Sequence, residues 1–206
     1  MHQTRKGSTT KLPVPRKGTK YLVRASSHVR NSVPVLIAIR DMLKLARNSK
    51  EVKGLIHTKS LKINGKMVKD YHESIKLFNI LEADKPYVLS ILPSGKFAFV
   101  ESKVKDSRLC KISNKKRLNS SLFQFNLHDG SNIVSKENIP VGGSFYLDFS
   151  GKVMKHVPLK EGSKIFVMSG RHIGKEGIIE SILDGRVLIK FTEGSAQIQK
   201  SRVVAL

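Results

Sequence analysis

The sequence is poor in residues that build covalent frameworks and aromatic platforms. Its 206 residues include one cysteine, Cys110, and no tryptophan, and aromatic residues make up 6% of the chain. A single cysteine excludes an internal disulfide framework and a multi-thiolate zinc site, and it is typical of a reducing cytoplasmic compartment. The scarcity of aromatic side chains argues against a surface on which bases of single-stranded nucleic acid stack.

Apolar runs long enough for a membrane are also absent. No stretch approaches the roughly twenty consecutive apolar residues that span a bilayer, and the N-terminus lacks the apolar core of a signal peptide. Positive charge is spread along the chain rather than concentrated on one amphipathic helix, which disfavours a membrane-surface protein. The sequence therefore predicts a cytoplasmic protein that does not interact with membranes.

Acidic residues are scarce as well. Asp and Glu number 16 against 38 Lys and Arg, so the formal net charge is +22, and no acidic residue precedes Asp41. Because such an excess destabilises a compact chain through self-repulsion, it indicates a polyanionic partner. With 39% hydrophobic residues the chain can still bury real cores, and its length predicts two or three small domains.

Groupings typical of enzymes and metal sites are missing. The seven histidines form no pair three or four residues apart, so a zinc site is not expected. Asp129, Glu137 and Asp148 form no convincing carboxylate pair. His128-Asp129 could be part of a nucleophile relay, but a turn between strands explains it better. We therefore expect no enzyme activity, no catalytic residue, no cofactor, no metal and no small-molecule substrate.

Residues 34–70 show the clearest regular pattern, and it begins as a helix. Pro34 suits a first helical turn. The apolar positions that recur at helical spacing are Leu36, Ile39, Leu43 and Ala46, and the cations along their flank are Arg40, Lys44 and Arg47. Asn48-Ser49 predicts the end of this helix and the N-cap of a second one. In that second helix the inward positions are Val52, Leu55 and Ile56, and the outward positions are Lys50, Lys53 and His57.

The period changes to two after Ser60, and Asn64-Gly65 predicts a tight hairpin. The only acids in residues 34–70 are Asp41, Glu51 and Asp70, against nine Lys and Arg. A helix surface that serves only solubility usually mixes the two signs in pairs. This segment is therefore predicted to bind an anion, with an ordinary solvated surface as the alternative.

The remaining segments differ in composition. Residues 1–33 form a basic arm whose composition offers little apolar surface for a core of its own. We expect it to thread into RNA and to order on phosphates, with a floppy terminus as the alternative, and the sequence leaves open whether it is ordered when free. Residues 74–100 have patterns typical of strands, and we expect these strands to complete the core of residues 34–70.

In residues 101–157, apolar residues alternate in two strand-length runs, Phe123, Phe125, Leu127 and Phe145, Leu147, Phe149. The pattern predicts a central antiparallel β domain with Lys115-Lys116-Arg117 on an exposed loop. In residues 158–206 we expect strands over 164–168, 178–182 and 187–191, with a hairpin turn at Asp184-Gly185. Gly170, Gly174 and Gly177 lie in the connection between the first two strands rather than before a helix, which favours a small barrel over a nucleotide loop.

Two motifs resemble known RNA-binding modules. The run V-M-S-G-R-H-I-G-K-E-G-I-I within residues 162–182 resembles the KOW motif of ribosomal proteins and transcription elongation factors. Residues 34–69 resemble the alpha-hairpin module of bacterial ribosomal protein four and certain pseudouridine synthases, although no room remains for a synthase domain. With the basic L-P-V-P-R-K-G-T-K-Y arm and the L-H-D-G-S-N-I run at 127–133, the chain from about Lys11 onward resembles the archaeal and eukaryotic (e) type of ribosomal protein four, in its archaeal branch.

The resemblance implies an α+β multi-domain chain that is a structural constituent of the small ribosomal subunit and takes part in translation. It implies a basic arm (1–33), an alpha-hairpin RNA-binding domain (34–100), a central β domain (101–157) and an SH3-like KOW barrel (158–206). The expected partners are small-subunit rRNA and neighbouring ribosomal proteins, and no homo-oligomer is expected. The alternative is a KOW-containing regulator of transcription or translation, which the uniformly basic composition disfavours.

The candidate rRNA-binding residues are basic positions from all four segments. They are Arg16, Lys17, Lys20, Arg24 and Arg30 in the arm, Arg40, Lys44, Arg47, Lys50, Lys53, Lys59, Lys62 and Lys66 in the alpha-hairpin domain, Lys115, Lys116 and Arg117 in the central domain, and Arg171, His172 and Lys175 in the glycine loop. Such contacts to phosphates set position, while the shape of the folded RNA supplies most of the specificity.

Overall fold

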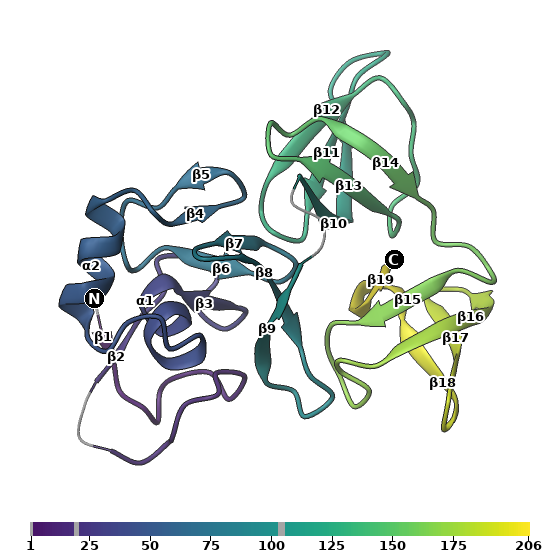
Figure 1. Ribbon diagram of the computed structural model, residues 1–206. Helices are drawn as coiled ribbons and strands as arrows, with labels where there is room; N and C mark the ends of the chain where they lie inside the picture. Colours follow the sequence, from purple (N-terminus) through teal and green to yellow (C-terminus); the bar gives the residue numbers. More distant parts are fainter. Residues whose placement is uncertain (1, 19–20, 103–105) are drawn as a thin grey trace. The chain divides into compact units, whose positions relative to one another are not determined.

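Strands dominate the chain, and helices are few and short (Figure 1). The computed structural model describes residues 2–18, 21–102 and 106–206. These residues form two compact units, Met1–Lys105 and Asp106–Leu206, which we call the first and the second unit. The polar stretch after Glu101, where the sequence suggested a boundary, lies at the junction of the two units.

The basic arm is part of the fold of the first unit, and this answers a question that the sequence left open. Strand β1 (His2–Gln3) pairs antiparallel with β2 (Leu22–Val23). Leu12 and Leu22 are almost completely buried, and the Lys11 carbonyl accepts a hydrogen bond from the Phe97 amide. The few apolar side chains of the arm therefore use a core built by other segments, which composition within the arm could not indicate.

The first predicted helix is much shorter than the apolar spacing suggested. Helix α1 (Val35–Ile37) continues only as a π-helical turn η1 (Ala38–Met42), and Lys44 has a positive φ of 57°. The Leu43 amide bonds to the Ala38 carbonyl, which is the wider spacing of a π turn. Residues 35–39 are buried on every side, so they form an internal turn rather than a surface helix with one apolar stripe.

The second helix and the hairpin match their predictions. Helix α2 (Ser49–His57) begins after Asn48, whose side-chain oxygen accepts from the Lys50 and Glu51 amides at 2.9 and 3.0 Å. Val52 is buried, and the outward lysines are exposed. Strands β4 (Lys62–Ile63) and β5 (Lys66–Met67) flank Asn64-Gly65, and both turn residues have positive φ, as a type I′ turn requires.

A five-stranded antiparallel sheet in the order β5-β4-β7-β8-β9 forms the rest of the first unit. Its further strands are β7 (Ile80–Glu82), β8 (Pro86–Ile91) and β9 (Phe97–Glu101). Buried and partly exposed residues alternate along β8, as expected for a strand that covers one core face. A separate short pair, β3 (Ser32–Pro34) and β6 (Ser74–Lys76), lies beside α1 (Figure 1). The predicted hairpin over residues 87–100 is confirmed.

The second unit begins with a sheet in the order β12-β11-β10-β13-β14. Its strands are β10 (Ser107–Arg117), β11 (Phe123–Leu127), β12 (Asn132–Ser135), β13 (Ser144–Asp148) and β14 (Val153–Val157). Phe125 and Phe145 meet edge to face in its core, as their alternation predicted. Lys115, Lys116 and Arg117 are not on a loop, because β10 continues to Arg117 and pairs with β11.

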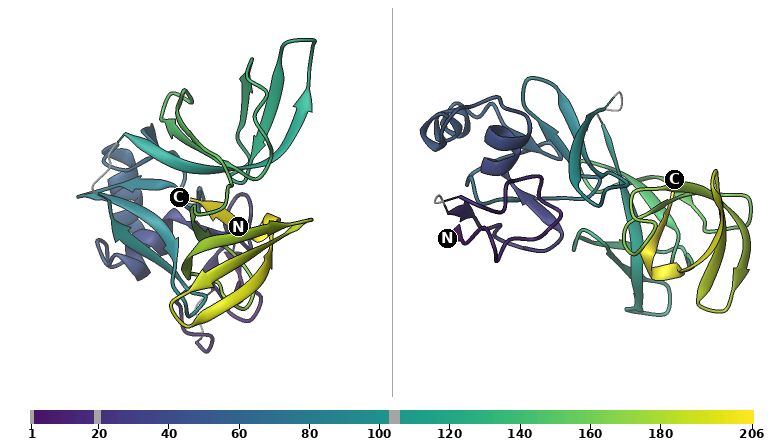
Figure 2. Two further views of the ribbon diagram at one scale, coloured as in Figure 1. Left: turned by 90° about the vertical axis from the view of Figure 1, so that its right-hand side faces the viewer. Right: turned by 90° about the horizontal axis from the view of Figure 1, so that it is seen from below.

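The C-terminal sheet has the order β18-β17-β16-β15-β19 and curls round its own core (Figure 2). Its strands are β15 (Lys164–Val167), β16 (Glu176–Leu183), β17 (Arg186–Phe191), β18 (Gly194–Gln199) and β19 (Val203–Ala205), with a 3₁₀ turn η2 (Lys200–Arg202) before the last. The first three strands and the turn at Gly185 were predicted; β18 and β19 were not. The result is a half-barrel.

The three glycines that the sequence placed in one loop have two different roles, because Gly170 and Gly174 precede β16 whereas Gly177 lies within it. Gly170 and Gly174 have positive φ values of 98° and 76°, which fits the tight connection between β15 and β16. At Gly177 a Cβ atom would lie 2.6 Å from Cγ2 of Ile189 and 2.8 Å from the Lys190 carbonyl oxygen. Gly177 therefore permits close approach of β16 to β17, rather than an unusual backbone angle.

Candidate nucleic-acid interface

A cluster of cations lies on α2 and the segments that follow it. Lys50, Lys53 and His57 are exposed on one side of α2, and the turn after the helix and the end of the hairpin add Lys59 and Lys69. We call these five residues the α2–hairpin face. Residues 44–69 contain eight Lys and Arg and one acid, Glu51. The Glu51 carboxylate accepts from the Arg47 amide and the Asn48 side chain, so it caps the helix rather than opposing the cations.

Four residues of the α2–hairpin face line a hollow of about 710 Å³: Lys53, His57, Lys59 and Lys69. The rest of the lining includes Ile56, Met67 and Tyr71 and one acid, Asp70. The Lys53 ammonium lies 5.2 Å from the centre of the Tyr71 ring, a cation–π distance that holds the lysine beside the hollow. A concave site lined mainly by cations and apolar side chains suits a phosphate chain whose sugars or bases enter the hollow.

The other predicted cations of this segment do not share one helical flank. Arg40 donates from Nε and Nη2 to the two carboxylate oxygens of Asp41 at 3.0 and 2.7 Å, so much of its charge is neutralised. Lys44 and Arg47 are exposed but follow the end of η1. Lys62 is half-buried in β4, and Lys66 is exposed in β5.

The arm forms a second basic hollow of about 670 Å³. Arg24 and Arg30, both predicted, line it together with Lys11, which the sequence did not single out. The Lys11 ammonium donates to the Asn31 side chain at 2.6 Å, and burial lowers its pKa. Arg16 donates to the Lys6 carbonyl, and Lys17 is exposed. Lys20 lies outside the described residues.

Two of the three predicted cations at the end of β10 are engaged within the chain. Lys115 donates to the Asn138 side chain and the Ile139 carbonyl, and its ammonium lies 5.4 Å from the centre of the Phe123 ring. Arg117 donates to two carbonyls of the following turn. Lys116 is exposed. These contacts leave this group less able to bind phosphate than the α2–hairpin face.

The glycine loop also uses most of its basic side chains internally. The His172 ring stacks on Phe191 with ring centres 5.2 Å apart. Lys175 forms an ion pair with Glu193, and its hydrogen bond holds the pKa of that carboxyl below the ordinary value. Arg171 is exposed. The loop therefore presents one uncommitted guanidinium rather than the cluster of three cations that the sequence suggested.

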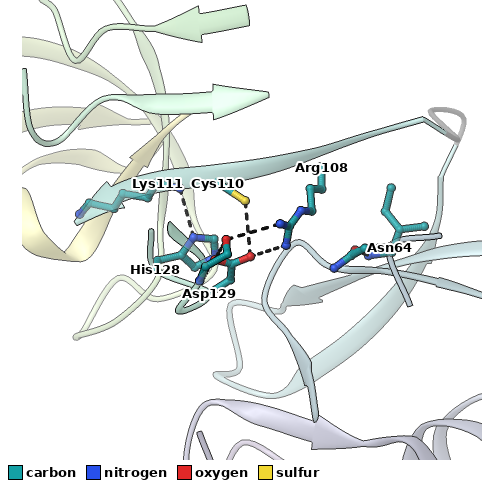
Figure 3. Close-up of polar contacts among 8 residues, drawn as sticks. Asn64, Arg108, Cys110, Lys111, His128 and Asp129 are labelled. Carbon is teal, nitrogen blue, oxygen red and sulfur yellow. Dashed lines mark hydrogen bonds and ion pairs between the residues drawn. The ribbon is translucent and has the colours of Figure 1, made fainter. Parts of the chain in front are cut away.

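The His128-Asp129 pair belongs to a structural turn (Figure 3). Asp129 is 3% exposed, forms an ion pair with Arg108 and accepts from the Ser131 amide and hydroxyl. Burial raises the pKa of Asp129, but the Ser131 hydrogen bonds and the Arg108 charge outweigh it, so the pKa lies below its ordinary value. Burial raises the pKa of the neighbouring Cys110 thiol to about 12, which makes a reactive thiolate unfavourable.

Sequence reasoning missed one lysine altogether. Lys111, whose backbone amide donates to the His128 ring in Figure 3, is 3% exposed. Its ammonium donates to the Lys200 and Ser201 carbonyls, both at 2.7 Å, and so connects β10 to the turn before β19. Burial lowers its pKa to about 8. Its place in L-C-K-I, among apolar neighbours, was the only signal in the sequence.

The described part of the chain offers no cluster of three or more potential metal ligands. Among the same residues, no helix has the length and apolar character required to cross a bilayer.

Comparison with known proteins identifies the family. A sequence model described as Ribosomal family S4e matches residues 83–153. The protein named small ribosomal subunit protein eS4 of Desulfurococcus amylolyticus is 31% identical over 191 residues, which cover 84% of this chain and 76% of that protein. The chain belongs to the ribosomal family S4e. The protein of the same name from Archaeoglobus fulgidus is 29% identical, over 88% of this chain and 80% of its own length.

A solved structure of an S4e protein has a similar fold. The crystal structure of the 30S ribosomal protein S4e from Thermoplasma acidophilum matches with a TM-score of 0.74, covering 85% of this chain and 95% of that one, at 23% sequence identity. The resemblance stated from the sequence is thus confirmed, and the two named relatives are archaeal, as expected. The mostly β architecture with few helices is consistent with the S4e fold.

Proposed function

We propose that this S4e family chain is a structural constituent of the small ribosomal subunit, that it binds small-subunit rRNA, and that the α2–hairpin face is its principal phosphate-binding surface. The function follows from the relatives, which are named as small ribosomal subunit proteins. A binding role without catalysis, inside the cytoplasmic ribosome and among neighbouring ribosomal proteins, belongs to the same proposal.

The observation that supports the surface is its large excess of positive charge. Eight cations and one acid occur in residues 44–69, and the acid is held in the helix cap. Asp70, which also lines the hollow, accepts a hydrogen bond from the His72 amide. Each lysine that reaches a phosphate releases condensed counterions, which supplies most of the sequence-independent affinity. The hollow beneath Lys53 and Lys59 adds a shape that can receive an irregular part of the RNA.

The finer layout is part of the proposal. Residues 34–100 act as an alpha-hairpin RNA-binding domain, residues 101–157 as a central β domain, and residues 158–206 as an SH3-like KOW barrel. The arm, residues 1–33, adds the hollow lined by Arg24 and Arg30. A KOW-containing regulator remains the second candidate in principle, but no feature of the described residues favours it.

The test measures the affinity of the purified full-length chain for small-subunit rRNA over a series of salt concentrations. In the test variant, Lys50, Lys53 and Lys59 are each replaced by Glu. We expect affinity to fall by about 100-fold. The slope of log affinity against log salt concentration should become shallower by the amount that corresponds to about two to three lost phosphate contacts. Circular dichroism checks that the variant is folded, since all three side chains are exposed.

The matched control reverses three exposed cations of the C-terminal sheet, Lys164, Arg186 and Lys190, and therefore changes the net charge equally. It should keep most of its rRNA affinity. Equal losses in both variants would show that the protein binds through overall charge and not through the α2–hairpin face. Sedimentation of the tagged wild-type chain with small subunits after a high-salt wash tests the ribosomal role itself; sedimentation with polymerase would support the regulator.

A further inference from the structure

The basic hollow of the arm has a different lining from the hollow beside α2. Of the ten described residues that line it, none is acidic and only Val29 has an apolar side chain. The others are small, hydroxyl-bearing or amide residues and three cations, Lys11, Arg24 and Arg30. The hollow beside α2, in contrast, has four apolar or aromatic side chains and one acid. The first hollow, which we call the arm hollow, therefore offers cations and hydrogen-bond donors but no platform for a base.

Two cations of the arm hollow are not used by the fold. Arg24 and Arg30 are exposed, and within the described part of the chain no hydrogen bond or ion pair engages their guanidinium groups. Two other arginines of the arm, Arg5 and Arg16, donate to backbone carbonyls of the arm. A guanidinium is a planar fork of donors that fits two oxygens of one phosphate. The arm hollow thus presents two such forks to a ligand.

The third cation, Lys11, is partly buried without a carboxylate partner. Its ammonium donates to the Asn31 side chain at 2.6 Å and lies 5.8 Å from the centre of the Phe97 ring. Burial lowers the pKa of Lys11, and no acid precedes Asp41 in the sequence. A partly desolvated cation whose partner is a neutral amide is stabilised when an anion lies beside it. The position of Lys11 therefore favours an anionic ligand in the arm hollow.

Both walls of the arm hollow are held in place by the fold. In the first wall, the buried Ser8 donates to the Arg5 carbonyl at 2.8 Å, and the Lys11 carbonyl accepts from the Phe97 amide at 2.8 Å. In the second wall, the Asn31 amide donates to the His28 carbonyl at 2.7 Å. A site whose walls are ordered before binding loses little conformational entropy when its ligand enters.

The arm hollow is linked to the α2–hairpin face through two consecutive residues. Tyr71 lines the hollow beside α2 and contacts Lys53. The ring of the next residue, His72, donates from Nδ1 to the carbonyl of Arg24 at 3.0 Å, and Arg24 lines the arm hollow. An RNA strand on the α2–hairpin face can therefore continue into the arm hollow.

A protein segment fits the lining of the arm hollow less well than an RNA backbone. Protein interfaces gain most of their affinity from apolar and aromatic anchors at their centre. In the arm hollow, Val29 is the only apolar side chain that such an anchor would meet. An RNA backbone consists of phosphates and sugar hydroxyls, which bind to cations and hydrogen-bond donors. The lining therefore favours phosphates.

We propose that the arm hollow is a phosphate-binding site that holds the backbone of an RNA strand independently of its bases, through Arg24, Arg30 and Lys11. This inference rests on the proposed function, because the strand belongs to the small-subunit rRNA that the α2–hairpin face binds. It gives the two hollows of the first unit different tasks: the hollow beside α2 receives sugars or bases, and the arm hollow receives phosphates.

The test compares three probes on the isotope-labelled full-length chain: a short single-stranded RNA, an oligonucleotide of the same length that lacks every base, and pyrophosphate. Fluorescence anisotropy measures affinity over a salt series, and NMR spectra report the backbone amides. Both oligonucleotides should shift the amide signals of Gly7, Thr10 and Asn31, which line the arm hollow. Pyrophosphate should shift the same signals only at higher concentration, because it cannot reach the α2–hairpin face at the same time.

Substitutions in the arm hollow then test its residues. With Arg24→Gln and Arg30→Gln combined, affinity should fall by about tenfold for the RNA and for the abasic oligonucleotide alike, and the salt slope should lose about two phosphate contacts. Lys11→Met keeps an unbranched side chain against Phe97 and should lower affinity by about threefold. The control combines Arg186→Gln and Lys190→Gln, two exposed cations of the C-terminal sheet. It removes the same charge as the double arginine variant and should lower affinity by less than about twofold.

Four results would overturn the inference. A loss of affinity for the RNA but not for the abasic oligonucleotide would show that the hollow recognises bases. Equal losses in the arginine variant and in the control would show an effect of overall charge. Saturation of the hollow by pyrophosphate at a lower concentration than by the abasic oligonucleotide would assign it to a free phosphate compound. Displacement of the oligonucleotide by a glutamate-rich peptide of equal charge, at equal concentration, would show that phosphate is not selected.

The proposed function fails in a different way. A chain whose arm hollow binds the abasic oligonucleotide, but which does not bind small-subunit rRNA or enter small subunits, contradicts the proposed function. Loss of rRNA affinity in the Lys50, Lys53 and Lys59 variant, together with full affinity in the double arginine variant, contradicts the inference about the arm hollow alone.

Discussion

The α2–hairpin segment and the C-terminal sheet carry the same number of cations but differ in acids. Residues 44–69 hold eight Lys and Arg with one acid, whereas residues 158–206 hold eight with five acids. In the first region the acid caps a helix, while in the second Glu193 neutralises Lys175 and two other glutamates lie exposed on β16. Counts of lysine alone therefore do not distinguish the two regions. The number of neighbouring acids does.

The two regions also differ in how the backbone presents side chains. In α2, residues three and four apart share one side, so a short helix can expose several lysines together. In the C-terminal sheet, a row of neighbours comes from three separate strands, and its composition depends on strand register. The helix face could thus be read from sequence spacing, but the row in the sheet could not.

The largest effect is expected at a lysine that belongs to neither surface. Replacement of Lys111 by Met leaves the Lys200 and Ser201 carbonyls without their donor and should lower the free energy of unfolding by about 2 kcal/mol. Replacement of the exposed Lys116, in the same strand, should change stability by less than about 0.5 kcal/mol. Chemical denaturation of the three proteins measures the difference; equal stabilities would show that Lys111 does not connect β10 to the C-terminal turn.

The same lysine predicts a pH dependence. The ordinary pKa of lysine is about 10.4, and burial lowers that of Lys111 to about 8. Between these values the unfolded chain binds more protons than the folded chain, so this group makes the free energy of unfolding rise with pH. The advantage of wild type over the Lys111→Met variant should grow by about 2 kcal/mol between about pH 7 and pH 10. A constant difference would contradict the lowered pKa.

Two glycines should respond in opposite directions to the same substitution. Gly177→Ala brings a Cβ against Ile189 and the Lys190 carbonyl and should destabilise the second unit by about 1–3 kcal/mol. Gly54→Ala, within α2, meets no atom within 4 Å and should stabilise the first unit by about 0.5–1 kcal/mol. Thermal unfolding of both variants measures the effects. A stable Gly177→Ala protein would mean that β16 and β17 do not need the close approach.

The contrast in charge can be removed by design. Replacing Glu176 and Glu180 by Lys removes both acidic residues from the strands of the C-terminal sheet. The affinity for RNA of unrelated sequence should then rise by about 3–10-fold at low salt. The matched variant with Gln at both positions should show a smaller rise. Filter binding over a salt series measures both. No change in either variant would mean that the glutamates do not keep RNA from this face.

The smallest effect concerns the helix cap. Asn48→Ala removes the acceptor of the Lys50 and Glu51 amides and should cost about 1 kcal/mol of stability. Because α2 then frays at its first turn, rRNA affinity should fall a few-fold. Asn119→Ala, in an exposed turn, is the control. An intact rRNA affinity in a measurably destabilised Asn48→Ala protein would show that the α2–hairpin face does not require an ordered first turn.

Local signals predicted those elements whose structure depends on neighbouring residues. Asn48 marked the start of α2, Asn64-Gly65 marked the hairpin, and the alternation around Phe125 marked β11. Each signal has a local cause: a side chain that caps free amides, a turn that requires positive φ, or a strand with one buried face. The predicted length of the first helix was wrong because residues 35–39 are buried on all sides. The spacing rule for surface helices with one apolar stripe does not apply to such a segment.

The sequence by itself determined the basic character, the absence of enzyme-like groupings, the family resemblance and the cationic α2. Only the tertiary structure decided which cations remain available. It pairs Lys175 with Glu193, buries Lys111 and folds the arm onto a core supplied by other segments. It also brings Lys164, Ile178 and Lys190 into one row. The physical reason is that ion pairs between strands, burial and strand register depend on residues far apart in the chain, whereas caps, turns and charge counts do not.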